Sequence, residues 1–581
     1  MEEYRTYLSS QITEEQIGKV VKLAGFVHSI RDHGGIKFVD LRDEDGFTQL
    51  VFHDESKLAD ITKESVISIE GKVEKRSDDT INNKIISGKV EVVVNNINLL
   101  SKSNNVLPFE IMESEKVSED LRLKYRYLDM RNPNCARRMK LREDVIWDIR
   151  CFMRENNFHD VHTPILSADS PEGARCFLVP SRLHHGEFYV LPQSPQQFKQ
   201  LLMIGGLGKY YQIAPCFRDE DSRAFRSAGE FYQLDMEMSY ANQQDVQELT
   251  EKLIKQLFTK FGTLKLDDSK PFVHIPYREA MLKYGSDKPD LRNPIEIKEL
   301  TDIFANTTFS AFANCTVRGF ALNTNGQSKS FYENLTQYMI NEGAGGLAWL
   351  RVLEDGSLKG PITKFTTIEE LDSLKKRVDA KIGDDIFIIA DKKQVKCEKL
   401  IGLLRLEIGR KCNLVKEDSY EFCWIDDFPF YEFNEDTQSI DFGHNPFTLP
   451  QGGLKALQTQ EPLNILAHQY DLVCNGVEVA SGAVRNTNVE TMVKAFEIAG
   501  YNENTIKEKF TAMYHAFTFG APPHAGIAPG LETMLMLLDN VTNIRDVIPF
   551  PMNAKAQDLL MGAPSKVSEK QLREAHIKVR D

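Results

Sequence analysis

Five short runs of strand-forming residues lie within the first 105 residues of this 581-residue chain, separated by glycine, aspartate and asparagine turns. The runs cover residues 20–28, 36–41, 48–52, 66–73 and 89–99. This spacing predicts a small closed β-barrel such as an OB-fold. Such barrels bind single-stranded nucleic acid through aromatic and basic side chains, which Phe38, Arg31, His28 and His33 could supply. A purely structural β-domain with Phe38 in its core fits the same residues.

The pattern changes after a polar stretch that we interpret as a linker. Amphipathic spacing predicts helices over 136–156 and 248–261, and strands are expected over 158–164, 188–191, 210–217 and 231–240. Helical segments at 298–304, 330–341 and 396–411 with a strand at 386–390 predict an inserted α/β module. From Tyr420 the chain returns to strands with Gly-rich turns, followed by a helix from Pro529.

Charge and cysteine content narrow the functional classes. The formal net charge of −14 argues against non-specific coating of nucleic acid, but it leaves room for a local basic face. The sequence contains no apolar run of about 18 residues, and its polar, acidic start does not resemble a signal peptide. The nine cysteines are scattered without a CxxC pair, which indicates reduced thiols in a cytoplasm. We therefore expect a cytoplasmic protein without a membrane partner.

Two segments concentrate charged side chains. Arg218 is expected at the end of a strand and precedes the acidic residues 219–221, so it could clamp a phosphate. Asp471 and Glu478 are expected on two strands joined by an Asn475-Gly476 turn, and they could share Mg²⁺ bound to a nucleotide. A solvated loop and a plain hairpin with surface acids are the alternatives.

Two further segments lead into predicted helices. Residues 519–530 are rich in glycine and proline, so their backbone could approach a ligand closely beside a helix N-terminus. They lack the Lys-Ser/Thr pair of a phosphate-binding P-loop. Residues 193–199 form a turn that enters a helix. A loop that caps a core helix and an ordinary capped helix start fit equally well.

In this order the segments resemble the bacterial aspartyl-tRNA synthetase family of class II, from about Tyr4 to Pro551. The resemblance implies an α+β multidomain chain with an antiparallel catalytic sheet and an inserted GAD-type domain. Its parts would be an anticodon-binding OB-fold (1–105), a linker (106–124), a catalytic domain in two parts (125–289 and 419–560), the insertion (290–418) and a tail (561–581). It also implies a homodimer that activates L-aspartate with ATP to aspartyl-adenylate and transfers it to tRNA(Asp).

The resemblance also assigns site residues. Arg218 and Glu478 would be catalytic, and Asp471 with Glu478 would hold Mg²⁺. Aspartate would contact Glu172, Gln196, Gln197, Phe198, Lys199, Arg218, His444 and Arg485. ATP would contact Arg218, Asp219, Glu220, Glu478, Gly530, Leu531, Glu532 and Thr533. No general base is required, since the aspartate α-carboxylate is already ionised at neutral pH.

Three positions depart from the family pattern. The third family motif ends Gly-(Leu/Ile/Met)-Asp-Arg, whereas this chain has Thr533 at the arginine position. Loss of one such preorganised donor costs about 3–4 kcal/mol of transition-state stabilisation. Cys176 and Phe225 also occupy positions that are usually acidic. A paralogue that binds tRNA or aspartate but has weakened or lost adenylation is therefore the alternative.

His33 lies in the segment Arg31–Asp32–His33–Gly34–Gly35. The resemblance associates histidine at this position with relaxed tRNA choice, so tRNA(Asn) would be charged as well as tRNA(Asp). An ordinary turn histidine is the alternative.

Overall fold

The computed structural model describes residues 3–104, 106–168, 174–221, 229–435 and 437–580. Two compact units divide the chain, Met1–Val117 and Ser118–Asp581. Glu172 and Phe225 lie outside the described residues. Within the described part, no helix combines the length and apolar character that a membrane span needs. All nine cysteines are free thiols.

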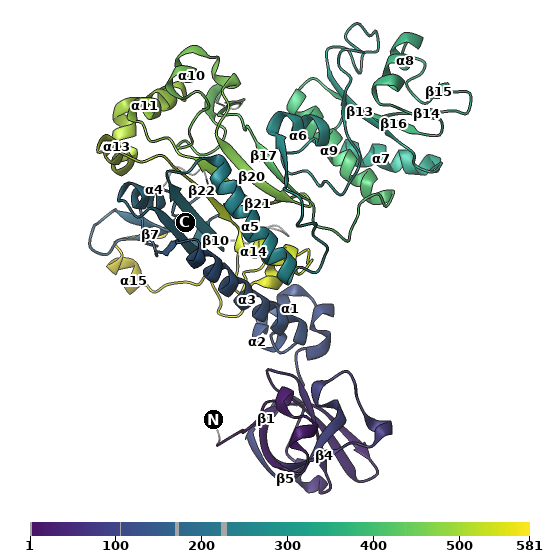
Figure 1. Ribbon diagram of the computed structural model, residues 1–581, viewed down its shortest axis with the longest axis vertical. Helices are drawn as coiled ribbons and strands as arrows, with labels where there is room; N and C mark the ends of the chain where they lie inside the picture. Colours follow the sequence, from purple (N-terminus) through teal and green to yellow (C-terminus); the bar gives the residue numbers. More distant parts are fainter. Residues whose placement is uncertain (1–2, 105, 169–173, 222–228, 436, 581) are drawn as a thin grey trace. The chain divides into compact units, whose positions relative to one another are not determined.

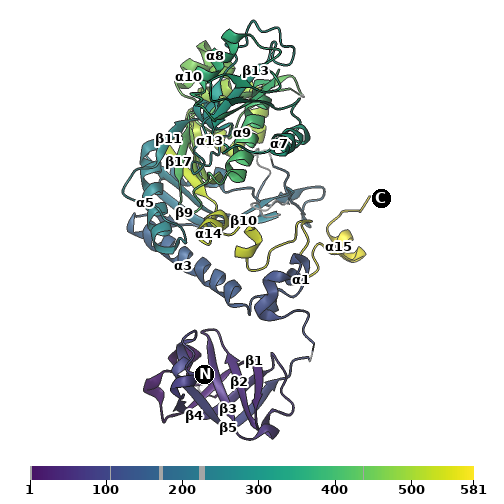
Figure 2. The same cartoon turned by 90° about the vertical axis from the view of Figure 1, so that its right-hand side faces the viewer.

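The first unit is a closed five-stranded barrel, which confirms the predicted OB-fold (Figures 1 and 2). Its strands are β1 (Val20–His33), β2 (Ile36–Arg42), β3 (Phe47–Phe52), β4 (Val66–Lys75) and β5 (Val90–Ser101). The order is β1-β2-β3-β5-β4, and the long β1 closes the barrel by pairing with both β2 and β4. Phe38 is half-buried and meets the ring of His33 edge-on at 5.7 Å, so it is not a fully buried core residue.

The second unit is built on an eight-stranded sheet in the order β11-β17-β20-β21-β22-β10-β9-β6. The strands are β6 (His159–Asp160), β9 (Lys209–Arg218), β10 (Gly229–Ser239), β11 (Val273–Pro276), β17 (Phe422–Asp426), β20 (Gln469–Cys474), β21 (Val477–Val484) and β22 (His524–Pro529). Within the described strands of this sheet, only the two edge pairs, β11 with β17 and β6 with β9, are parallel. The sheet is therefore antiparallel where β9, β10, β21 and β22 meet, as expected.

The strand predicted over 158–164 is much shorter than expected, because β6 contains only two residues. The backbone N–H of Thr163 donates to the side chain of Gln212 on β9 at 2.7 Å and not to a backbone carbonyl of that strand. Pro164 follows and has no N–H to offer. The ladder therefore ends before the proline.

Three helices, α3 (Pro133–Glu155), α5 (Gln243–Phe261) and α14 (Leu531–Leu538), pack with this sheet (Figure 1). Pro133 occupies the first turn of α3, and the Asn132 side chain caps the helix. The shared core includes Val145 of α3, Leu253 of α5 and Leu535 of α14, all fully buried. Since α14 begins two residues after β22 ends, these contacts fix the start of α14 relative to the sheet.

Further helices and two short hairpins complete the described part of this region. The helices are α1 (Glu119–Lys124), α2 (Arg126–Asp129), α4 (Gln196–Ile204), α6 (Tyr277–Tyr284), α10 (Gly453–Thr459), α11 (Val489–Ile498), α12 (Glu503–Lys509), α13 (Thr511–Thr518) and α15 (Glu569–Glu574). The hairpins pair β7 (Leu178–Pro180) with β8 (Phe188–Val190), and β18 (Tyr431–Asn434) with β19 (Ser439–Phe442).

Residues 298–411 form a second sheet in the order β12-β13-β16-β14-β15, covered by three helices. Its elements are β12 (Lys298–Glu299), β13 (Thr316–Leu322), α7 (Lys329–Asn341), β14 (Ala348–Val352), β15 (Leu358–Lys359), α8 (Ile368–Arg377), β16 (Asp385–Asp391) and α9 (Gln394–Lys411). We call this group of elements the inserted module. The helix predicted over 298–304 is wrong: Lys298 and Glu299 pair with β13, and this non-local pairing overrides the local helical pattern.

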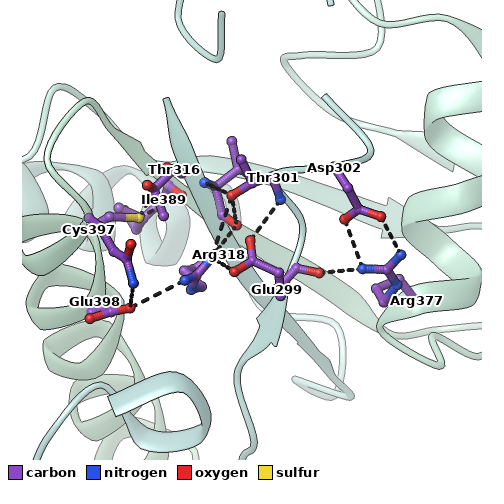
Figure 3. Close-up of polar contacts among 11 residues, drawn as sticks. Glu299, Thr301, Asp302, Thr316, Arg318, Arg377, Ile389, Cys397 and Glu398 are labelled. Carbon is purple, nitrogen blue, oxygen red and sulfur yellow. Dashed lines mark hydrogen bonds and ion pairs between the residues drawn. The ribbon is translucent and has the colours of Figure 1, made fainter. Parts of the chain in front are cut away.

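Polar contacts tie the helices of the inserted module to its sheet (Figure 3). Arg318 of β13 forms ion pairs with Glu299 of β12 and, at 3.3 Å, with Glu398 of α9. Arg377 of α8 pairs with Asp302 at 2.8 Å. The Cys397 thiol donates to the carbonyl of Thr316 at 3.3 Å. Helix α9 is therefore fixed to the sheet through neighbouring positions of its first turn.

Candidate active site

A cavity of about 1010 Å³ lies over the central strands of the eight-stranded sheet. Arg218 at the end of β9 and Asp235 of β10 line it, together with Glu478 of β21 and Thr533 of α14. Ligand sites typically occupy about 300–1,000 Å³, so this cavity can hold two small ligands side by side. Its walls come from strands of the eight-stranded sheet, chiefly β9, β10 and β21, from helices that include α4 and α14, and from loop residues such as 443–446.

Four charged side chains alternate in sign at one end of the cavity. Arg485 donates from Nε and Nη2 to the two carboxylate oxygens of Glu237, at 2.9 and 3.1 Å. Lys199 Nζ lies 2.6 Å from Asp235 Oδ1 and 3.4 Å from Glu237 Oε2. Each of the four side chains is at most 4% exposed. Buried charges persist when paired in this way, and the pairing fixes their orientation.

The two carboxylates of this group have opposite pKa shifts. Burial alone would raise the pKa of Glu237, but Arg485 and Lys199 outweigh it and lower that pKa. Burial dominates at Asp235 and raises its pKa, although Lys199 opposes the shift. Glu237 therefore favours its charged form and holds Arg485 in place. At Asp235, burial favours the neutral form and the neighbouring Lys199 favours the charged one.

Beside this group, Gln196 Nε2 is buried without a hydrogen-bond partner in the described structure, and Asp235 Oδ2 has none at hydrogen-bond distance, although the Tyr210 hydroxyl interacts with the Asp235 carboxylate. Both side chains line the cavity. An unpaired buried polar atom costs about 1–3 kcal/mol. A ligand that offers an ammonium to Asp235 and an oxygen to Gln196 would remove this cost. An amino acid has both groups.

Arg218 and Phe231 form the other end of the cavity. The guanidinium of Arg218 lies 5.0 Å from the centroid of the Phe231 ring, and its Nε is buried without a partner among the described residues. Glu220 also lines this end. A planar cation, an aromatic face and a nearby carboxylate suit a nucleotide base and its phosphate.

The first turn of α14 closes this end of the cavity. Glu532 accepts from the backbone N–H of Tyr232 and from Arg142 Nη2 of α3, both at 2.8 Å. The Glu532 carboxylate therefore joins β10, α3 and α14. The next residue, Thr533, faces the cavity without a charge.

The predicted acidic hairpin is present. β20 and β21 pair antiparallel around a turn in which Asn475 and Gly476 have φ of 52° and 85°, as a tight hairpin turn requires. Asp471 is buried, and its Oδ1 has no partner among the described residues. Burial, and then the neighbouring Glu478, raise the pKa of Asp471. In the described residues, no cluster of three or more His, Cys, Asp or Glu side chains forms a preformed metal site.

Most predicted site residues come together. Those that line the cavity are Gln196, Lys199, Arg218, Glu220, His444, Glu478, Arg485, Gly530, Glu532 and Thr533. Those that are described but do not line it are Gln197, Phe198, Asp219, Asp471 and Leu531. Helical spacing explains the difference within α4, because positions three apart share a face whereas the two between them turn away.

Two other predicted positions lie apart from these groups. Cys176 is half-buried, and Gln193 Nε2 donates to its sulfur at 2.9 Å. His33 is exposed at the end of β1, in the barrel.

The sequence analysis missed Asp235, Glu237 and Lys288. The first two lie two residues apart on β10 and so face the same side of the sheet. Acidic residues at alternate positions within an apolar strand were the available signal. Lys288 follows α6 in a loop, and no local pattern distinguishes it from a surface lysine.

Comparisons with known proteins agree with this geometry. Residues 118–554 match the family described as class II tRNA synthetases (D, K and N), and residues 21–100 match an OB-fold nucleic acid binding domain. The aspartate–tRNA ligase of Streptomyces avermitilis is 51% identical over 585 residues, covering 100% of this chain and 99% of the relative. The aspartate–tRNA(Asp/Asn) ligase of Rickettsia bellii is 48% identical, covering 99% and 98%.

Solved structures share the fold. The aspartyl tRNA synthetase of Entamoeba histolytica superposes with a TM-score of 0.57 at 20% identity, covering 94% of this chain and 92% of that one. The asparaginyl-tRNA synthetase of Pyrococcus horikoshii, complexed with asparaginyl-adenylate, gives 0.56 at 18% identity, covering 94% and 98%.

Proposed function

The chain belongs to the class II tRNA synthetases of the D, K and N group, and we propose that it is an aspartate–tRNA ligase. The observation that carries this function is that Arg485 lines the cavity and is held there by the buried carboxylate of Glu237. The pair uses Nε and Nη2 of Arg485, which leaves Nη1 for a substrate carboxylate. An Arg–carboxylate contact of this kind favours aspartate, because asparagine has no charge to pair with it.

The first step joins aspartate to the α-phosphorus of ATP. An oxygen of the aspartate α-carboxylate forms the new O–P bond, and the bond from that phosphorus to the β-phosphate bridge breaks, so pyrophosphate leaves. Arg218 neutralises charge on the α-phosphate and the attacking carboxylate, which fits its position at the end of β9. Catalysis is therefore a matter of positioning and charge.

The second step transfers aspartate to tRNA. A hydroxyl of the terminal ribose attacks the activated carbonyl carbon, its proton passes to the departing phosphate, and AMP leaves with the former carboxylate oxygen. Gln196, Lys199 and His444 would hold the amino acid in both steps. Glu172 would contact the substrate ammonium. Gln197 and Phe198 would support the contacts that α4 makes with the amino acid.

Asp471 and Glu478 would hold Mg²⁺. The residues fit the ion, because Asp471 contributes an unpartnered buried carboxylate oxygen and Glu478 places a second carboxylate at the cavity. When bound with ATP, the ion would neutralise phosphate charge. Asp219, Glu220, Gly530, Leu531, Glu532 and Thr533 would frame the nucleotide.

The barrel would bind the anticodon region of tRNA(Asp), and His33 would relax the choice so that tRNA(Asn) is charged too. One of the two relatives above carries the Asp/Asn name, which supports this proposal. We further propose a cytoplasmic homodimer with the domain division given in the sequence analysis.

Aspartate-dependent exchange of pyrophosphate into ATP tests this function. We expect exchange with aspartate and none with asparagine. Thr533 favours a second candidate, a paralogue that binds its ligands without forming adenylate, and saturable binding of aspartate and ATP without exchange would support it.

A further inference from the structure

The lysines and arginines that line the cavity are Lys199, Arg218, Lys288, Arg485 and the exposed Lys509 of α12. Lys199 and Arg485 are committed to Asp235 and Glu237 at the amino-acid end. Arg218 lies at the end of β9, beside the expected α-phosphate. Thr533 contributes no charge, so the triphosphate needs another positive group along its path.

Lys288 lies where such a group is needed. It lines the cavity, and its Nζ is 3.1 Å from Glu478 Oε2 and 3.0 Å from Asp287 Oδ2. Its side chain is 36% exposed. An ammonium has three donors, so Lys288 can keep Glu478 and still reach a phosphate oxygen.

Residues 285–297, between α6 and β12, form a loop that carries Lys288, and we call it the Lys288 loop. Helix α9 of the inserted module holds this loop. Arg405 of α9 is fully buried and donates to the carbonyls of Ile295, Asn293 and Asp290, at 2.6, 2.6 and 3.0 Å. Asn293 Nδ2 donates back to the Arg405 carbonyl at 3.0 Å. The loop therefore exchanges hydrogen bonds with α9 in both directions.

One glycine, Gly285, lets the loop approach α9 closely, and the loop also packs against the acidic hairpin. A Cβ on Gly285 would lie 2.4 Å from the Glu398 carbonyl oxygen of α9, and Gly285 has φ of +66°. On the other side, a Cβ on Gly476 of the acidic hairpin would lie 3.4 Å from Asp290 Cβ. The loop is thus packed between α9 and the hairpin. Glu398 also pairs with Arg318, which fastens this part of α9 to the module's sheet (Figure 3).

We propose that Lys288 binds the β- and γ-phosphates of ATP, and pyrophosphate in the reverse reaction, and that α9 of the inserted module positions it for this role. The inference rests on the proposed function and adds a phosphate-binding residue to it. It gives the inserted module a direct part in the chemistry, because the module fixes a side chain that touches substrate.

Lys288→Met tests the proposal, since methionine keeps the length of the side chain and removes its charge. Lys288→Arg is the conservative variant, and Lys283→Met on α6 is the matched control, because Lys283 pairs with Glu279 by one 2.7 Å contact away from the cavity. Binding of ATP, pyrophosphate, AMP and aspartate is measured separately by calorimetry in magnesium buffer, without turnover. Thermal unfolding of each variant is recorded alongside.

We expect Lys288→Met to weaken ATP and pyrophosphate binding by about tenfold or more and to leave AMP and aspartate binding within about twofold. Lys288→Arg should recover most of the loss. Unchanged ATP and pyrophosphate binding in Lys288→Met would overturn the proposal, as would an equal loss for AMP. If Lys288→Met does not fold, Lys288→Gln replaces it with the same two outcomes. Failure of the unaltered protein to bind ATP or aspartate would instead contradict the proposed function.

Discussion

Arg485 and Glu237 are 248 residues apart in the chain and form a two-pronged ion pair in the interior of the protein. The contact fixes the plane of the guanidinium before a substrate arrives. Nε and Nη2 are occupied and Nη1 makes no hydrogen bond within the described structure, so the cavity presents one oriented cationic donor. Preorganisation of this kind avoids the cost of ordering the side chain during binding.

Arg485→Lys should therefore lower kcat/KM for aspartate by about 10²-fold or more, because a lysine ammonium lacks the planar fork that binds both oxygens of Glu237 and holds a further donor in a fixed direction. The affinity for ATP should change little. Lys494→Arg on the exposed face of α11 serves as the control for a cation exchange. Equal kcat/KM values for aspartate in Arg485→Lys and the unaltered protein would refute this role.

Thr533→Arg should raise kcat/KM for ATP in pyrophosphate exchange, by up to about 10²–10³-fold, because it adds a cationic donor to the cavity wall. Thr533→Met adds length without charge and should give no such gain. The account of the third motif fails if the arginine and methionine variants have the same activity.

Gly285→Ala should destabilise the protein by about 1–3 kcal/mol and weaken ATP binding, since a methyl group at φ +66° meets the α9 backbone and displaces the Lys288 loop. Gly343→Ala is the matched control, with φ of +92° and no atom within 4 Å of its Cβ. Chemical denaturation and ATP titration of both variants measure the two effects. The same loss of ATP binding in both variants would rule out the loop contact as the cause.

His524 should make stability depend on pH. It is fully buried, and burial lowers its pKa, although Glu237 opposes the shift. The folded state then binds fewer protons than the unfolded state, so stability is retained above the ordinary histidine pKa of about 6.5 and falls as pH drops below it.

The slope from this one group is at most about 1.4 kcal/mol per pH unit. Denaturation of His524→Gln and the unaltered protein between neutral and mildly acidic pH measures it. The advantage of the histidine protein over the variant should shrink as pH falls. A constant difference across the range would show that His524 is not the titrating group.

Charging of purified tRNA(Asn) should reveal the role of His33. We expect the unaltered protein to attach aspartate to both tRNA(Asp) and tRNA(Asn), and His33→Gln to lose mainly the second reaction. His53→Gln, elsewhere on the exposed surface of the barrel, is the control. If tRNA(Asn) is not charged, the His33 inference is wrong while the aspartate pocket is unaffected.

Local patterns in the sequence predicted the elements whose structure is set locally. The Asn475-Gly476 turn specifies its hairpin, and the strand that ends at Arg218 is an apolar run of the right length. Glu237 and Lys288 escaped prediction because they have partners distant in sequence: Glu237 pairs with Arg485, and Lys288 pairs with Glu478. The helix predicted over 298–304 was wrong for the same reason, since β12 exists only by pairing with β13.

The central claim is that one cavity holds aspartate and ATP and joins them. A rapid-quench experiment with labelled ATP, aspartate and pyrophosphatase, without tRNA, measures this directly. The account predicts aspartyl-adenylate retained on the protein in stoichiometric amount, and none when asparagine replaces aspartate. Saturated binding of both ligands with no adenylate formed would contradict it.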